Sequence, residues 1–259
     1  MKDLRANLRL VADRTAGNAD MTTDEPLSAL FLSESMADLN EGATFLDRLS
    51  MEEVTFIRSR GSTIKASRGE GIFHQGDPHE GIFLIESGRV RTFCTGPSGR
   101  ELTLAYWTPG HFIGGPEVFG GTHLWSGEAM EDSRVMALSG TVVRDLIERM
   151  PIFALCLIDG LVAKGKCYSQ LVQMLGTRSV SQRLAQLLKI MGEVHGAPDD
   201  DGVLIDRRVT HDQLADIVGS TRQWVTTTLD RWQKDEIILI RGRMIVIRQS
   251  DALEDLADS

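Results

Sequence analysis

The sequence predicts an α+β protein made of an N-terminal antiparallel β-roll, a long helix and a C-terminal winged helix-turn-helix. Short β-rich runs with glycine turns fill residues 62–139, a helical pattern follows Pro151, and two short helices joined by a tight turn follow Val209. A chain of 259 residues is long enough for more than one domain. The predicted divisions are a polar arm (1–40), the β-roll (41–145), the long helix (146–178) and the winged helix-turn-helix (179–259).

The N-terminal part changes in composition and in its hydrophobic pattern along its length. The polar arm has only short helical stretches, at Leu4–Val11 and Leu27–Met36, and a clearer helical pattern covers Glu41–Arg58. Five β-rich runs follow: Gly71–His74, Ile82–Glu86, Val90–Cys94, Leu102–Trp107 and Ser133–Leu138. Evenly spaced short strands with glycine turns are typical of an antiparallel roll or barrel.

The long helix is predicted to begin at Pro151, since proline is favoured in a first turn, and to reach about Leu175. Alternating spacings of three and four, as in paired helices, relate Ile158, Leu161, Gly165, Tyr168, Val172 and Leu175. A second register runs through Leu157, Leu161, Lys164, Tyr168, Leu171 and Leu175. It would place a lysine in the seam, so we prefer the first. The alternative is one amphipathic helix packed on its own domain.

A second helix is predicted over Val180–Val194, with Ser179 as its cap, and a polar loop over His195–Gly202. The segment VTHDQLADIVGSTRQWVTTTL then predicts the helix-turn-helix. Thr210 caps its first helix with Gln213 in a capping box. Gly219 suits the turn, because glycine tolerates a positive φ.

The second helix of this motif is predicted to read DNA. Ser220 or Thr221 caps it, Val225 and Leu229 face inward, and the early outward positions are Arg222, Gln223 and Thr226. Arginine pairs with guanine, glutamine with adenine, and threonine with a thymine methyl or a phosphate. An ordinary helical hairpin is the alternative.

A hairpin after the motif predicts a wing. The runs Ile237–Ile240 and Met244–Ile247 flank Arg241-Gly242-Arg243, whose two arginines are expected to contact phosphates. Residues 221–248 hold six Lys/Arg and three Asp/Glu, whereas the whole chain has a net charge of −9. This balance favours a site-specific DNA binder with a small basic face over a non-specific polyanion binder.

Other classes of protein are disfavoured. No apolar run reaches the roughly 18 residues that span a bilayer, and the N-terminus lacks the apolar core of a secretory signal, so we expect a cytoplasmic protein without a membrane partner. The chain has three scattered cysteines, whose spacing fits neither a disulfide framework nor a metal site: Cys94, Cys156 and Cys167. We interpret them as buried thiols. A redox role of Cys167 is the lesser alternative. No catalytic or nucleotide-binding fingerprint is present, so we expect no enzyme activity.

The order of these parts resembles the CRP/FNR family of bacterial transcription regulators. The resemblance covers roughly residues 45–248 and is carried by Phe73-His74-Gln75-Gly76, Gly88, Gly110, Phe112-Ile113-Gly114, the helix after Pro151 and the helix-turn-helix segment. It implies a cyclic-nucleotide-binding-like jelly roll and a homodimer paired along the long helices. It also implies a two-fold symmetric double-stranded DNA site, and contact with RNA polymerase if the protein activates transcription.

For DNA reading, the resemblance matches Arg222 and Gln223 to the family's first two base-contacting positions, and Thr227 replaces an arginine often found at a third. The neighbouring Trp224 is left open between a phosphate contact and packing against the wing.

The sensory segment departs from the cyclic-nucleotide pattern. Gly115 stands where the family's ribose-binding glutamate would be, and Trp125 where the phosphate-binding arginine would be, although Ser126 remains. No Lys or Arg occurs between Arg100 and Arg134. Burying an unpaired phosphodiester is costly, so cyclic AMP is disfavoured as effector, although an alignment slip would let Glu117 serve for the ribose.

The sequence instead favours a flat, largely uncharged or aromatic effector between roll and helix. The candidate residues are Trp107, Gly114, Gly115, Trp125, Ser126, Tyr168 and Ser169, of which the last two match the positions that touch adenine in cyclic-AMP receptors. The alternatives are aromatic side chains that simply fill the roll, effector-independent DNA binding, or haem held by His123, with His111 and His79 as weaker ligands. An iron–sulfur cluster is excluded, because no cysteine precedes Cys94.

Overall fold

The computed structural model describes residues 48–79, 81–114 and 118–258. The polar arm and its two short helices lie outside these residues. Helix α4 (Met51–Arg60) begins later than the predicted Glu41. Ser50 caps it, since its hydroxyl accepts a hydrogen bond from the Glu53 amide while the Glu53 carboxylate accepts one from the Ser50 amide.

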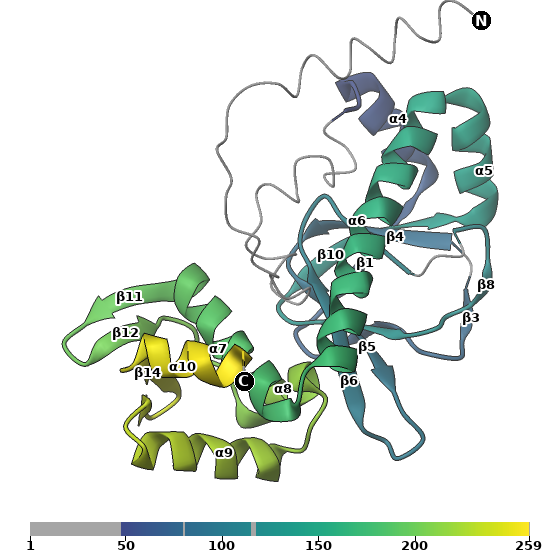
Figure 1. The fold of residues 1–259 in the computed structure, drawn as a ribbon. Helices are drawn as coiled ribbons and strands as arrows, with labels where there is room; N and C mark the ends of the chain where they lie inside the picture. Colours follow the sequence, from purple (N-terminus) through teal and green to yellow (C-terminus); the bar gives the residue numbers. More distant parts are fainter. Residues whose placement is uncertain (1–47, 80, 115–117, 259) are drawn as a thin grey trace, which may run out of the picture.

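The β-roll follows α4 (Figure 1). Its strands are β1 (Ser62–Ala66), β2 (Gly71–Phe73), β3 (Pro78–His79), β4 (Gly81–Ser87), β5 (Val90–Thr95), β6 (Glu101–Trp107), β7 (Phe112–Ile113), β8 (Gly121–Thr122), β9 (Ser126–Ala129) and β10 (Ser133–Ser139). They form two four-stranded antiparallel sheets, in the orders β1-β10-β4-β7 and β2-β9-β5-β6, and a small β3-β8 pair. The predicted roll and its five runs are confirmed, and the additional strands are mostly too short to show a pattern of their own.

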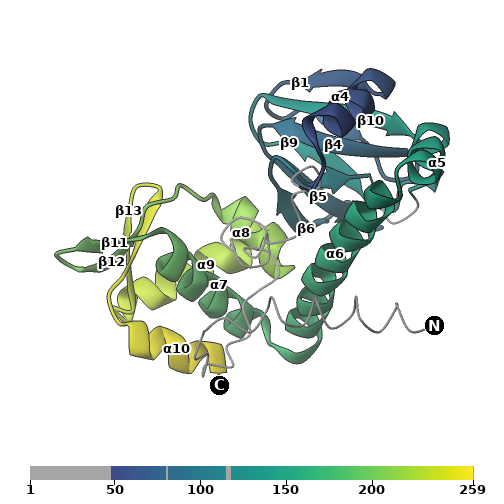
Figure 2. The same ribbon diagram turned by 90° about the horizontal axis from the view of Figure 1, so that it is seen from above.

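Two helices connect the roll to the C-terminal domain. Helix α5 (Gly140–Arg149), capped by the Ser139 hydroxyl, was not predicted, and the predicted domain division at residue 146 falls inside it. Helix α6 (Pro151–Thr177) is the predicted long helix, with its proline in the first turn. It runs along the roll and ends beside the C-terminal domain (Figures 1 and 2). No helix of the described residues is both long and apolar enough to cross a membrane.

The C-terminal domain contains the predicted winged helix-turn-helix. It comprises α7 (Val180–His195), β11 (Gly196–Asp199), β12 (Gly202–Ile205), α8 (His211–Val218), α9 (Arg222–Lys234), β13 (Ile238–Arg241), β14 (Met244–Ile247) and α10 (Ser250–Asp258). The prediction of a loop over His195–Gly202 is wrong, because β11 pairs with β12 in a sheet of order β11-β12-β14-β13. The acidic tail forms α10, which packs on α7 through Leu253 and Ala257.

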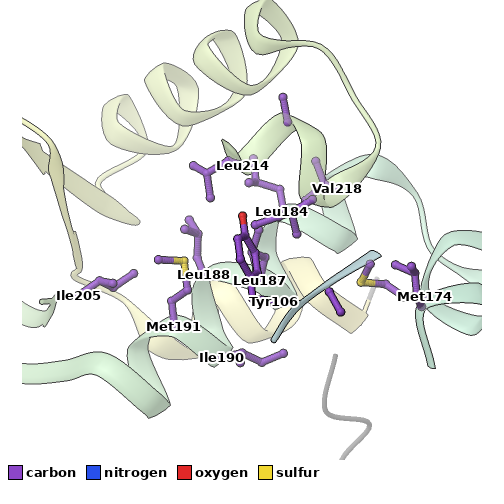
Figure 3. Close-up of a cluster of buried hydrophobic side chains, with 14 of the residues drawn as sticks. Tyr106, Met174, Leu184, Leu187, Leu188, Ile190, Met191, Ile205, Leu214 and Val218 are labelled. Atoms are coloured by element: carbon purple, nitrogen blue, oxygen red, sulfur yellow. The ribbon is translucent and has the colours of Figure 1, made fainter. Parts of the chain in front are cut away.

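One buried apolar cluster joins the roll to the C-terminal domain. Figure 3 shows Tyr106 of β6 among Leu184 and Leu188 of α7 and Leu214 of α8, and Met174 of α6 belongs to the same cluster. Helix α8 lies against β6 (Figure 2). The roll and the C-terminal domain therefore share a core, so a change in the roll can reach the helix-turn-helix through packed side chains.

Candidate DNA interface and effector site

The helix-turn-helix has the predicted local geometry. Thr210 and Gln213 form the capping box of α8, and Gly219 adopts a left-handed conformation at φ 65°. The cap of α9 is Thr221, whose hydroxyl accepts a hydrogen bond from the Trp224 amide. These contacts fix the angle between the two helices, with α9 as the helix that can enter a DNA groove.

The outer face of α9 carries the predicted reading residues. Arg222 has 70% of its side chain exposed and lies 3.5 Å from the exposed Asp212 carboxylate, while Gln223 and Thr227 are also exposed. Thr226 is half-buried, and its hydroxyl is hydrogen-bonded to His211 Nδ1 at 2.7 Å. The polar face is thus open to DNA at Arg222, Gln223 and Thr227, while Thr226 is partly covered.

The inner face of α9 is buried, as predicted. Val225 and Leu229 are fully enclosed, and Trp232 lies beside them in the core. The half-buried Trp224 packs against this same core, which favours packing over a phosphate contact for its ring.

The two arginines of the wing have different surroundings. Strands β13 and β14 pair from Ile238 with Ile247 to Arg241 with Met244, which confirms the predicted hairpin. Arg241 forms ion pairs with Asp199, at 2.8 Å, and with Asp201. A DNA phosphate would have to compete with these two carboxylates for Arg241, whose side chain is 45% exposed, so its phosphate contact stays a prediction. Arg243 is exposed at the wing tip.

At the junction between roll and long helix, three aromatic rings meet. Tyr168 of α6 stands edge-on to Trp107 of β6 at 6.5 Å and to Trp125 at 5.5 Å between ring centroids. The Trp107 indole donates a hydrogen bond to the Thr92 hydroxyl at 3.0 Å. Burial raises the pKa of Tyr168 well above its ordinary value, so this phenol stays neutral. The predicted aromatic residues are therefore brought together.

The other predicted effector residues that the structure describes have their own contacts. Ser126 is buried, and its hydroxyl accepts a hydrogen bond from the Gln75 amide at 3.0 Å. Gly114 has φ 125°, and its carbonyl accepts a hydrogen bond from His123. Gly115 lies outside the described residues. Ser169 is exposed in the single chain, so its assignment to the effector site stays a prediction.

His123, the candidate haem ligand, is buried in a stack of rings. Its ring lies 4.4 Å from that of Phe73 and 4.3 Å from that of His79, and its Nδ1 donates to the Gly114 carbonyl at 2.8 Å. This packing gives His123 a role in holding the roll together. It supplies no observation in favour of haem.

Comparison with known proteins gives the family. Residues 63–150 match the cyclic nucleotide-binding domain and residues 182–256 the Crp-like helix-turn-helix domain. The global nitrogen regulator of Synechococcus elongatus is 30% identical over 197 residues, which cover 72% of this chain and 85% of that protein. The chain belongs to the CRP/FNR family of transcription regulators.

Further relatives of this CRP/FNR regulator support the same family assignment. The cyclic AMP receptor protein of Thermus thermophilus is 27% identical, with 84% of this chain and 98% of that protein covered. The c-di-GMP responsive global regulator CLP of Xanthomonas campestris has the same fold, with a TM-score of 0.69 at 19% identity over 76% of this chain and 99% of that one. Regulators of this family bind DNA and act as dimers. The relatives are transcription regulators and not enzymes, in line with the prediction.

The regulator also contains a buried cation that sequence reasoning missed. Lys164 of α6 is 5% exposed, and its Nζ lies 3.6 Å from the centroid of the Trp107 ring and 4.7 Å from that of Phe112. No acidic side chain of the described residues forms an ion pair with it, and burial lowers its pKa to about 7. The second helix register contained the signal, because it placed Lys164 in line with Leu157 and Tyr168, which also face the roll.

The exposed face of α6 overlaps the predicted dimer seam only in part. Leu155, Ile158, Val162 and Val172 are between 50% and 69% exposed. Their spacing continues through the exposed Gly165, Ser169 and Gly176 in alternating steps of three and four. Of the predicted seam residues, Ile158, Gly165 and Val172 lie on this exposed face, whereas Leu161, Tyr168 and Leu175 are half-buried toward their own chain. The whole set 155, 158, 162, 165, 169, 172 and 176 is named the α6 stripe below.

Proposed function

We propose that this regulator binds a two-fold symmetric DNA site as a homodimer paired along the α6 stripe. We further propose that a flat, aromatic or apolar effector other than cyclic AMP controls it from the junction of roll and α6. If the protein activates transcription, it would also contact RNA polymerase.

The effector proposal rests on the contact of the Tyr168 ring with the rings of Trp107 and Trp125. Tyr168 belongs to α6, one position before Ser169 of the stripe, whereas both tryptophans belong to the roll. A ligand that opens this ring cluster would therefore move α6 relative to the roll and change helix pairing. For such a ligand to act as a switch, it must bind the DNA-competent state more tightly than the other state.

The residues of the junction argue against cyclic AMP. Trp125 occupies the position where the family's cyclic-nucleotide binders carry an arginine, and an indole cannot neutralise a phosphodiester. The one cation found inside the junction, among the described residues, is Lys164, and its Nζ lies against the faces of Trp107 and Phe112. Aromatic faces and a neutral phenol suit a flat ligand better than a buried phosphate.

The test uses the intact protein. Native mass spectrometry and an absorption spectrum should identify a co-purified small molecule and show whether haem is present. Binding of flat aromatic compounds should quench tryptophan fluorescence. Tyr168→Ala should remove the effector dependence of DNA affinity although the variant, which loses its contacts with two tryptophans, stays folded at the temperature of the assay. Calorimetry with millimolar cyclic AMP should show no saturable heat.

Two results would refute the effector proposal. One is saturable micromolar binding of cyclic AMP at the junction. The other is an unchanged effector response in Tyr168→Ala. A haem Soret band in the absorption spectrum would instead support a haem-based sensor.

A further inference from the structure

A cleft of about 550 Å³ lies between the roll and the C-terminal domain, apart from both the aromatic junction and the outer face of α9. Arg68 and Arg89 line it from the roll, and Arg207 and Arg208 line it from the segment that leads into α8. Tyr106 forms part of its apolar floor and is 4% exposed. The volume is that of an ordinary small-molecule site.

The charge of this cleft is opposite to that of the chain. Among the described residues, four arginines line it against two carboxylates, those of Glu131 and Asp206, in a protein with a net charge of −9. Arg89 and Arg207 are half-buried, so their charges are less screened than those of surface arginines. Four arginines that line one half-enclosed space give it a positive potential, which attracts anions.

The polar groups of the cleft suit a phosphorylated ligand. Arginine offers a planar fork of donors that matches phosphate bidentately. Arg207 donates to His195 Nε2 at 3.2 Å, which fixes the direction of its guanidinium group. The apolar floor, with Tyr106 and Met130, would accept the uncharged part of the same molecule.

We propose that this cleft binds a small metabolite with two or more phosphate groups, and that the ligand holds the DNA-binding domain against the roll. The two arginine pairs belong to different domains, so one ligand that contacts both pairs stabilises the present arrangement of the domains. The Asp216–Arg91 ion pair and the hydrogen bond from Arg100 to the Gly219 carbonyl, at 3.0 Å, hold the same two domains together elsewhere. The site is independent of the effector proposed for the aromatic junction.

The probes are sodium pyrophosphate and adenosine 5′-diphosphate, added to the intact protein at constant ionic strength set with NaCl. Calorimetry should show saturable binding of one ligand per chain, and the thermal midpoint should rise. Arg68→Gln and Arg208→Gln, both at exposed positions, should each weaken binding by about tenfold or more, because each removes a charge-assisted contact. Arg149→Gln, an exposed arginine of α5, is the matched control and should bind as the unmodified protein does.

Three outcomes would overturn the proposal. The first is no saturable heat and no thermal shift beyond the NaCl control. The second is an equal loss of binding in Arg149→Gln. The third is a loss of DNA affinity for all sequences in Arg68→Gln, with a reduced salt dependence and unchanged pyrophosphate binding. That result would assign the cleft to DNA backbone phosphates. The test uses Arg68 and Arg208 because both are exposed, so their replacement should leave the fold intact. Arg207 is half-buried, and its replacement could disturb folding.

Discussion

The guanidinium group of Arg91 on β5 lies 3.2 Å from the carboxylate of Asp216 on α8 and joins the roll to the first helix of the helix-turn-helix. The same group lies 2.8 Å from Glu101 and 3.9 Å from Glu128. One nearly buried cation therefore faces three carboxylates. Burial raises the pKa of Asp216, and the charge of Arg91 opposes this shift.

This arrangement predicts unequal effects for the two partners. Arg91→Gln leaves three partly exposed carboxylates without their cation and should lower the free energy of unfolding by about 1–3 kcal/mol. Asp216→Asn leaves Arg91 paired with Glu101, so its cost should stay within about 1 kcal/mol. Urea unfolding of the two single variants and the double variant measures both effects. Equal costs would mean that the cluster does not act through Arg91.

Lys164 predicts a specific dependence of stability on pH. Its pKa falls from 10.5 to about 7 on folding, because burial disfavours the charged amine. Between these values the unfolded chain binds more protons, so stability should rise with pH by up to about 1.4 kcal/mol per pH unit, and below pH 7 this contribution levels off at its lowest value. Cys167 acts oppositely above pH 9, because burial raises its pKa to about 12.

The variant Lys164→Met should therefore be more stable than the unmodified protein at pH 6 to 7. The difference should shrink as the pH rises toward 9. Urea midpoints at half-unit steps of pH measure it. A difference that does not change with pH would show that Lys164 does not titrate in this range.

The α6 stripe predicts where the dimer can be broken. Leu155→Glu places a charge in the seam and should increase the dimer dissociation constant by about tenfold or more. Leu124→Glu is a matched control, because Leu124 and Leu155 are both 51% exposed but Leu124 lies on the roll. Sedimentation velocity at several micromolar concentrations compares the two. Equal dissociation of both variants, or of neither, would place the dimer interface elsewhere.

Much of the C-terminal domain follows from local sequence. The caps at Ser179 and Thr210 and the turn at Gly219 each depend on a few neighbouring residues, and the structure confirms them. Strand β11 was missed because Gly196–Asp199 has the composition of a loop and becomes a strand only by pairing with β12.

The inner and outer faces of α6 were harder to predict. Several of its sides are apolar, so helix periodicity fits more than one seam. Contacts with the roll determine which side of α6 faces inward. Lys164 lies against the rings of Trp107 and Phe112, and Tyr168 contacts Trp125. Ion pairs between distant segments, such as that of Arg241 with Asp199, are likewise visible only in the folded chain.

The most direct test of DNA reading by α9 compares Arg222→Ala with Arg243→Ala. Each variant is titrated on a duplex selected from a random library and on its scrambled counterpart, at several salt concentrations. Arg222→Ala should cost about 1–3 kcal/mol per half-site on the selected duplex and relax base preference there. Arg243→Ala should weaken both duplexes alike and reduce the salt slope by about one unit. An equal loss on both duplexes in Arg222→Ala would contradict the assignment of α9 as the reading helix.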